Sequence, residues 1–70
     1  MKPRQFANAE EVERVICVLE KPMTINTISK LTGIEAHYIK SALRSLRFQG
    51  LVISKRVKNR VLWFRRGYHA

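Results

Sequence analysis

One glycine, Gly33, lies between two stretches whose apolar residues recur at helical spacing, and this feature constrains the fold most. The first stretch predicts a helix over 25–31 with Thr24 as its N-cap, and the second predicts a longer helix over 35–49. Glycine adopts a left-handed backbone at little cost just beyond a helix end, so the chain is expected to turn sharply there. The expected buried positions of the two helices are Ile25, Ile28, Leu31, Ile39, Ala42, Leu43 and Leu46.

A further helix is predicted before this pair. Asn8 and Glu11 have the spacing of a capping box, and apolar residues follow at helical spacing up to Leu19. The helix is expected over 9–20 and ends before Pro22, because a proline disfavours helical backbone in the residue before it. Its outer face is mixed in charge, which is typical of a helix that serves as scaffold.

After Gly50 the apolar period changes from that of a helix to that of a strand. Two strands are expected, over 51–57 and 61–66. The tight connection between them is residues 58–60, in which Asn59 tolerates the positive φ that a hairpin turn needs. The last four residues are expected to form a frayed tail.

The aromatic residues of the second strand have two interpretations. Alternation along a strand would place Leu62 and Phe64 on the core face and leave Trp63 facing a groove. Aromatics among basic residues also serve as stacking platforms for single-stranded nucleic acid. Packing of both Trp63 and Phe64 in the core is the favoured prediction.

Charge is distributed very unevenly along the chain. The 70 residues are expected to form one domain with its core over residues 8–66, and they carry a net charge of +9. Residues 1–29 hold four basic and four acidic residues, whereas residues 30–70 hold ten Lys or Arg and a single acid, Glu35. A one-sided excess of this kind is typical of a protein that binds a polyanion.

This order of elements resembles the winged helix-turn-helix family of DNA-binding domains. The residues that carry the likeness are "TISKLTGIEAHYIKSALRSLRFQGLVI", Thr27 to Ile53, with a turn glycine, an apolar stripe and the closing Gly50. The resemblance implies a mainly α fold, in which three helices are followed by a two- to three-stranded antiparallel wing. It also implies binding of double-stranded DNA, with the helix over 35–49 in the major groove.

The predicted third helix has a polar side opposite its apolar stripe. A helix in the major groove needs hydrogen-bonding groups and little bulk on its outward face. Arg44 can grip a guanine through two hydrogen bonds. Glu35 departs from the Ser, Thr or Asp that usually opens this helix in the family, and it is a candidate for reading a cytosine amino group. The predicted base-reading residues are Glu35, Ala36, His37, Lys40, Ser41 and Arg44.

The hairpin supplies a second set of candidate DNA contacts. Its cations are expected to hold phosphate or to enter a narrow minor groove, and so to contribute affinity rather than sequence preference. Three residues of the predicted second helix are expected to add phosphate contacts. The predicted backbone-binding residues are Thr24, Thr27, Lys30, Lys55, Arg56, Lys58, Asn59 and Arg60.

No arrangement of nucleophile and base or of metal ligands is visible, so the sequence predicts neither an enzyme nor a metal or cofactor site. Cys17, within a packed helical segment, is expected to be inert. The start of the chain lacks a signal peptide pattern and no apolar run suits a membrane span, so a cytoplasmic, nucleoid-associated protein is expected.

The sequence as a whole predicts a small transcriptional regulator of bacterial, phage or plasmid type that binds double-stranded DNA. Two other functions stay open. One is a winged helix that binds an acidic host protein such as a polymerase or nuclease, and the other is RNA binding. A homodimer formed through the first helix is also left open, since regulators often bind paired half-sites.

Overall fold

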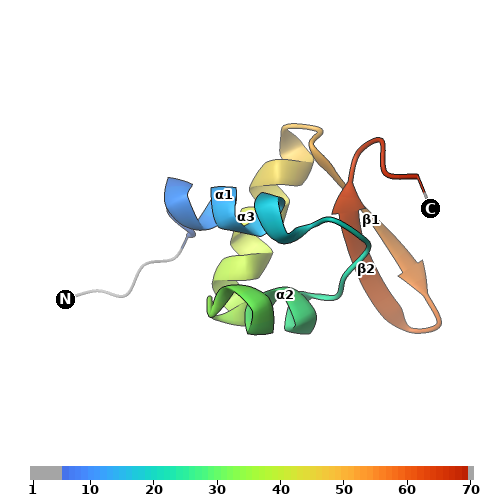
Figure 1. Cartoon of the computed structure of the whole chain (residues 1–70), viewed down its shortest axis with the longest axis horizontal. Helices are drawn as coiled ribbons and strands as arrows, with labels where there is room; N and C mark the ends of the chain where they lie inside the picture. The colour runs from blue at the N-terminus through green and yellow to red at the C-terminus, as the bar shows by residue number, and fades with distance from the viewer. Residues whose placement is uncertain (1–5, 70) are drawn as a thin grey trace.

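The computed structural model describes residues 6–69, which form three helices followed by an antiparallel hairpin. The helices are α1 (Ala9–Val18), α2 (Ile25–Thr32) and α3 (Ala36–Phe48), and the strands are β1 (Val52–Val57) and β2 (Arg60–Arg65). Both α1 and α2 pack on α3, and the hairpin, here called the wing, extends to one side of the helices (Figure 1). The predicted fold, mainly helical with a small β-hairpin, is confirmed.

A single apolar core joins all five elements. Every buried residue in the part of the chain that the structure describes is apolar. The four buried positions expected on α3 are confirmed, and each is at most 2% exposed. The core residues are Val15, Leu19, Met23, Ile28, Ile34, Ile39, Ala42, Leu43, Leu46, Val52 and Trp63.

Leu31 is an exception to the predicted apolar stripe of α2. It is 59% exposed, whereas Ile28 is fully buried. A step of three residues falls about 60° short of a full helical turn, so two such steps from Ile25 rotate Leu31 away from the core. Thr32, half-buried at the end of α2, lies closer to the direction of Ile25 and Ile28.

The sharp turn between α2 and α3 is present. Gly33 has a left-handed backbone with φ of 72°, and its N–H donates to the Ser29 carbonyl at 2.8 Å. The Ser29 hydroxyl donates to the Ile34 carbonyl at 2.6 Å, and the Thr32 hydroxyl donates to the Ile28 carbonyl at 2.8 Å. These bonds satisfy the end of α2 and fix the direction in which α3 leaves.

The capping box of α1 is confirmed. The Asn8 side chain accepts the Glu11 N–H at 2.8 Å, and the Glu11 carboxylate accepts the Asn8 N–H at 3.0 Å. The helix ends at Val18, two residues before its predicted end at residue 20. Leu19 already has a non-helical backbone, with ψ of 64°, and its side chain is buried.

The wing turns through two residues instead of the predicted three. Lys58 and Asn59 both have positive φ, 48° and 67°, which is the pattern of a type I′ turn. The positive φ predicted for Asn59 is confirmed, and Arg60 belongs to β2, where it pairs with Val57.

This shorter turn changes which side of β2 faces the core. A one-residue shift in register moves every side chain of a strand to the opposite face. The predicted connection would pair Ser54 with Phe64, but the observed register pairs Ser54 with Trp63. Trp63 is consequently a core residue, 8% exposed, and the prediction that Leu62 and Phe64 form the core face is wrong.

The outer face of the wing holds the remaining aromatic residues. Phe64 is half-buried there, opposite Ile53, and its ring centroid lies 6.3 Å from that of Tyr68. The Tyr68 N–H also donates to the Arg65 carbonyl at 3.1 Å, so Tyr68 is tied to the wing, in contrast to the frayed tail that the sequence predicts. The prediction that both aromatic residues pack in the core is therefore confirmed for Trp63 and wrong for Phe64.

A third segment pairs with β2 at one position. The Met23 N–H donates to the Trp63 carbonyl at 2.9 Å, and the Trp63 N–H donates to the Met23 carbonyl at 2.7 Å. The sheet thus has two strands and one isolated bridge. This bridge ties the wing to the chain just before α2, which holds it against the helices.

Candidate nucleic-acid interface

The exposed side of α3 carries three unpaired cations. Lys40, Arg44 and Arg47 recur at steps of four and three, so they lie along one side of the helix. All three are exposed, and none of their side chains forms a hydrogen bond or ion pair with another residue in the range 6–69. Their charge is therefore available to a ligand.

Two hollows join this side of α3 to the wing. One has a volume of about 630 Å³, and its lining includes Thr24, Ala36, Lys40 and Arg60. The other, about 370 Å³, is lined by the three α3 cations together with Ile25, Ser54, Val61 and Trp63, and we call it the α3–wing hollow. Neither lining includes a carboxylate. Residues from α3 and from β2 thus meet on one cationic surface.

Ser41 lies at the border of this surface, where it lines a further hollow together with His37, Lys40 and Arg44. It is half-buried, and its hydroxyl oxygen accepts the Ala7 N–H at 3.0 Å. That Ser41 contacts DNA beside Lys40 and Arg44 stays a prediction, and the structure shows its side chain partly exposed and bonded to Ala7. Ser41 follows Lys40 by one residue, which rotates it about 100° around the helix and toward the segment before α1.

The start of α3 has a contact of its own. Glu35 is the N-cap residue but makes no side-chain capping bond, as expected for glutamate. Its carboxylate lies 3.4 Å from His37 Nδ1, and the His37 ring lies 3.9 Å from the Tyr38 ring, centroid to centroid. His37 lines a hollow with Lys40, Ser41 and Arg44, and it does not line the hollow that contains Arg60. Glu35 and His37 are exposed at the edge of the cationic surface.

The predicted residues of α2 contribute mainly to its N-cap. Thr24 caps the helix by accepting the Thr27 N–H at 3.3 Å, and the two hydroxyl oxygens lie 3.1 Å apart. Thr24 also lines the larger hollow, so it lies on the cationic surface. Lys30 is exposed in the last turn of α2.

The predicted wing residues are divided between the two faces of the hairpin. Arg56 shares its face with Ser54 and Val61, toward α3, whereas Lys55 pairs with Leu62 on the outer face. Lys58 and Asn59 form the exposed tip. The structure brings Arg56 to the α3 side of the wing and places Lys55 on the opposite side.

Sequence reasoning missed Arg47 and Ser54 as part of this surface. Arg47 follows Arg44 by three residues, so helical spacing was a signal for it. Ser54 had no signal of its own, because its side depends on the pairing of β1 with β2.

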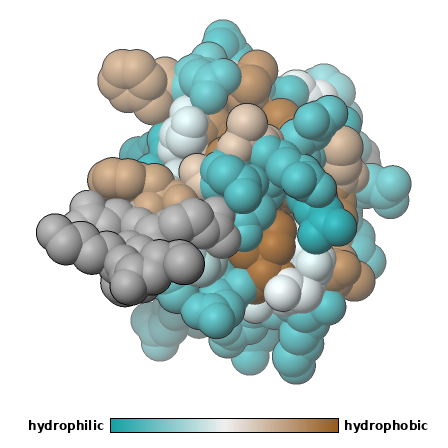
Figure 2. Space-filling model, turned by 90° about the vertical axis from the view of Figure 1, so that its left-hand side faces the viewer, coloured by the Kyte–Doolittle hydropathy of each residue, from teal (hydrophilic) through white to brown (hydrophobic). Residues whose placement is uncertain are grey.

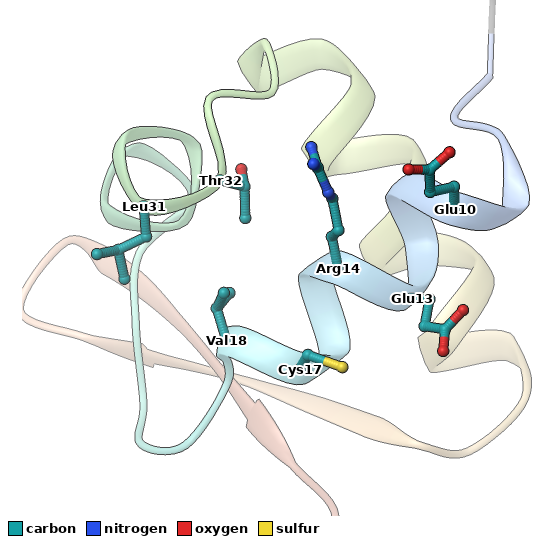
Figure 3. Close-up of a pocket in the computed structure, with 7 residues that line it drawn as sticks. All are labelled: Glu10, Glu13, Arg14, Cys17, Val18, Leu31 and Thr32. Carbon is teal, nitrogen blue, oxygen red and sulfur yellow. The ribbon is translucent and has the colours of Figure 1, made fainter.

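The opposite side of the molecule has a different character. A groove of about 510 Å³ runs between α1 and α2, and its lining includes two carboxylates, Glu10 and Glu13. Figure 3 shows Arg14 projecting from α1 between Thr32 and Glu10, with the exposed Leu31 on the α2 side. Figure 2, which views the end of the molecule away from the wing, shows apolar side chains mixed with hydrophilic ones. The carboxylates make this groove unsuitable for a phosphate backbone.

Cys17 lies in the same groove. It is exposed, and Figure 3 shows it near the end of α1 with its sulfur pointing away from Val18. The expectation that it is packed inside a helical segment is wrong, because Cys17 points away from the side of α1 that carries Val15.

Arg65, beyond the predicted site residues, stabilises the fold. Its Nε donates to the Ile16 carbonyl at 2.9 Å, and its Nη2 donates to the carbonyls of Ile16 and Cys17 at 2.6 and 3.2 Å. These carbonyls are at the C-terminal end of α1, where helical acceptors lack intrahelical donors and where positive charge is favourable.

We expect Arg65→Gln to lower the free energy of unfolding by about 1 kcal/mol, since it removes a charged donor from an exposed helix end. Urea unfolding followed by circular dichroism measures this change. Arg66→Gln is the matched control, because it removes the same charge from the next residue, and its effect should stay within about 0.5 kcal/mol. Equal losses in the two variants would contradict the capping role.

Among residues 6–69 there is no group of three or more His, Cys, Asp or Glu residues that could hold a metal ion. Over the same range, each helix is too short or too polar to span a bilayer.

Solved structures with similar backbones define the fold. The structure of a predicted DNA-binding transcriptional regulator from E. coli matches with a TM-score of 0.73 at 22% identity, over 86% of this chain and 64% of that one. One point mutant of ZitR from Lactococcus lactis matches with a TM-score of 0.71 at 21% identity, over 96% and 48% of the two chains. A different point mutant of ZitR, solved in complex with DNA, matches with a TM-score of 0.68 at 24% identity, over 86% and 43%.

These likenesses show that the chain has the winged-helix fold. The chain spans less than two thirds of the length of each of these proteins. A scan of protein-family models and a search of curated proteins give no match to the sequence.

Proposed function

We propose that this protein binds double-stranded DNA and acts as a small transcriptional regulator of bacterial, phage or plasmid type. The observation that carries the proposal is the single cationic surface on which Lys40 and Arg44 of α3 meet Arg60 of the wing, with no carboxylate in either hollow. A duplex presents a groove flanked by two phosphate backbones, and a helix beside a cationic hairpin fits that shape.

The residues of α3 have distinct roles in this proposal. Arg44 and Lys40 donate to base edges in the major groove, and the small side chain of Ala36 permits close approach of the helix. His37 and Glu35 lie at the edge of the contact and influence sequence preference. Ser41 stays in the base-reading set, because its hydroxyl oxygen accepts the Ala7 N–H and its own O–H can still donate to a base.

The remaining cations supply affinity. Arg56, Lys58 and Arg60 of the wing hold phosphate or enter the minor groove, with Asn59 at the tip and Lys55 reaching around the outer face. Thr24, Thr27 and Lys30 of α2 add backbone contacts. These groups bind every sequence alike, since phosphate carries no sequence information.

The solved structures with this fold support the proposal. One is described as a predicted DNA-binding transcriptional regulator, and another contains DNA. A regulator that binds DNA would act in the cytoplasm, on the nucleoid, and this location is part of the proposal.

Binding to random duplex DNA at increasing salt tests the function. A binder that neutralises about six phosphates should give a slope near −5 in a plot of log affinity against log salt. A weak response with a flat slope would contradict DNA binding and would favour an acidic protein partner. Competition between structured RNA and duplex DNA tests the alternative of RNA binding. A preference for RNA over duplex DNA would exclude reading of the major groove by α3.

A homodimer formed through α1 stays a prediction. Two copies would then present two α3 helices to paired half-sites.

A further inference from the structure

The floor of the α3–wing hollow contains polar groups that have no partner. Ser54 of β1 and Trp63 of β2 are directly opposite each other in the register and line the same hollow. The Trp63 indole N–H is buried and forms no hydrogen bond within residues 6–69, and the half-buried Ser54 hydroxyl likewise has no partner there. The Ser54 side chain is partly exposed, so its hydroxyl can donate to a ligand that enters the hollow.

The wall of the same hollow is strongly cationic. Lys40, Arg44 and Arg47 project from α3 on the side that faces the wing. Three unpaired positive charges close together repel one another unless an anion lies between them. The nearest acid along the helix, Glu35, is in contact with His37 and does not line this hollow.

Arg47 and Ser54 are the pair best placed to hold an anion here. They also share the lining of a second hollow with Arg66, so the two side chains lie side by side at the junction of α3 and β1. A guanidinium and a hydroxyl are both donors, and a tetrahedral oxyanion offers acceptors to both at once. The indole N–H of Trp63 is covered by protein atoms. Ser54 is therefore the donor that the wing offers to the hollow.

We propose that the α3–wing hollow binds one phosphate group, which is held by Arg47 and Ser54 and attracted by Lys40 and Arg44. This inference rests on the proposed function, in which the phosphate belongs to the backbone of a bound duplex. The inference adds Arg47 and Ser54 to the residues that contact DNA. Arg47 lies about one helical turn from the base-reading residue Arg44, toward the C-terminal end of α3. The site would position the duplex so that α3 enters the groove at a fixed depth.

The test measures how tightly the Arg47→Gln and Arg14→Gln variants bind random duplex DNA at several salt concentrations. Both variants remove one exposed arginine charge, but Arg14 lies in the acidic groove on the other side of the molecule. Loss of one phosphate contact should weaken binding about tenfold and make the salt slope less steep by about 0.9. Arg14→Gln should keep the affinity and slope of the unmodified protein. Ser54→Ala should weaken binding in the same direction by a smaller factor.

Trp63 provides a readout that does not depend on DNA. It is the only tryptophan in the chain and it lines the hollow, so its fluorescence should respond when pyrophosphate enters. The response should be lost in Arg47→Gln and kept in Arg14→Gln. If duplex DNA fails to bind while the pyrophosphate response persists, the phosphate site stands and the proposed function falls. If DNA binds and Arg47→Gln retains the unmodified protein's affinity, slope and fluorescence response, the site is overturned and the proposed function stands.

Discussion

Trp63→Ala is expected to lower the free energy of unfolding by about 3–5 kcal/mol, because it removes a large aromatic side chain from the core and leaves a cavity. Trp63 is 8% exposed and lies on β2 at the point where Met23 pairs with it. A chain of 70 residues has a total stability of roughly 4–10 kcal/mol. The variant should therefore lose a large fraction of its total stability, which urea titration followed by circular dichroism would measure.

Two further variants separate the role of Trp63 from a general sensitivity of the wing. Trp63→Phe keeps most of the apolar volume and removes the unpartnered indole N–H, so it should cost less than about 2 kcal/mol. Phe64→Ala alters the outer face and should cost about 1 kcal/mol, since that side chain is only half-buried. A greater loss for Phe64→Ala than for Trp63→Ala would show that the register of the wing is wrong.

Arg44→Ala is expected to remove most of the preference for one duplex sequence over others. A bidentate contact between arginine and guanine contributes about 1–3 kcal/mol of discrimination, which is roughly 5- to 150-fold in relative affinity. Arg44 is exposed on α3 and unpaired within residues 6–69, so its removal should leave the stability of the fold nearly unchanged. Sequences selected from a random pool by the unmodified protein provide the preferred duplex for this measurement.

Lys58→Ala is the matched comparison for Arg44→Ala. Lys58 lies at the tip of the wing and lines neither hollow beside α3, so it should contact phosphate alone. Removal of the Lys58 side chain should lower the affinity for the preferred duplex and for the random duplex by the same factor. Equal losses on both duplexes in the Arg44 variant as well would contradict the assignment of Arg44 to base reading.

Much of the fold could be predicted because the relevant interactions are local. The capping box of Asn8 and Glu11 spans three residues, and the left-handed turn at Gly33 involves residues within one helical turn. The buried stripe of α3 follows from its own spacing. The helical spacing of Lys40 and Arg44 likewise placed these two cations on the exposed side, where the structure has them.

The errors share a different cause. Both Trp63 and Phe64 were expected in the core, but the two-residue turn sets a register that brings Trp63 to the core face of β2 and leaves Phe64 on the outer face. Nothing along the chain distinguishes the two turn lengths strongly, since Asn59 suits either. The pairing of Trp63 with Met23, which lies far earlier in the chain, is visible only in three dimensions.

The sequence by itself determined the identity and order of the helices and strands, the sharp turn between α2 and α3, and the segregation of positive charge into the second half of the chain. Each of the local elements depends on residues within a few positions of one another. Only the tertiary structure decided that Ser41 bonds to Ala7, 34 residues away, and that Arg65 caps Ile16, 49 residues away. Such contacts depend on how packed elements are oriented, because a side chain's partner is set by the whole arrangement of the core and not by its neighbours in the chain.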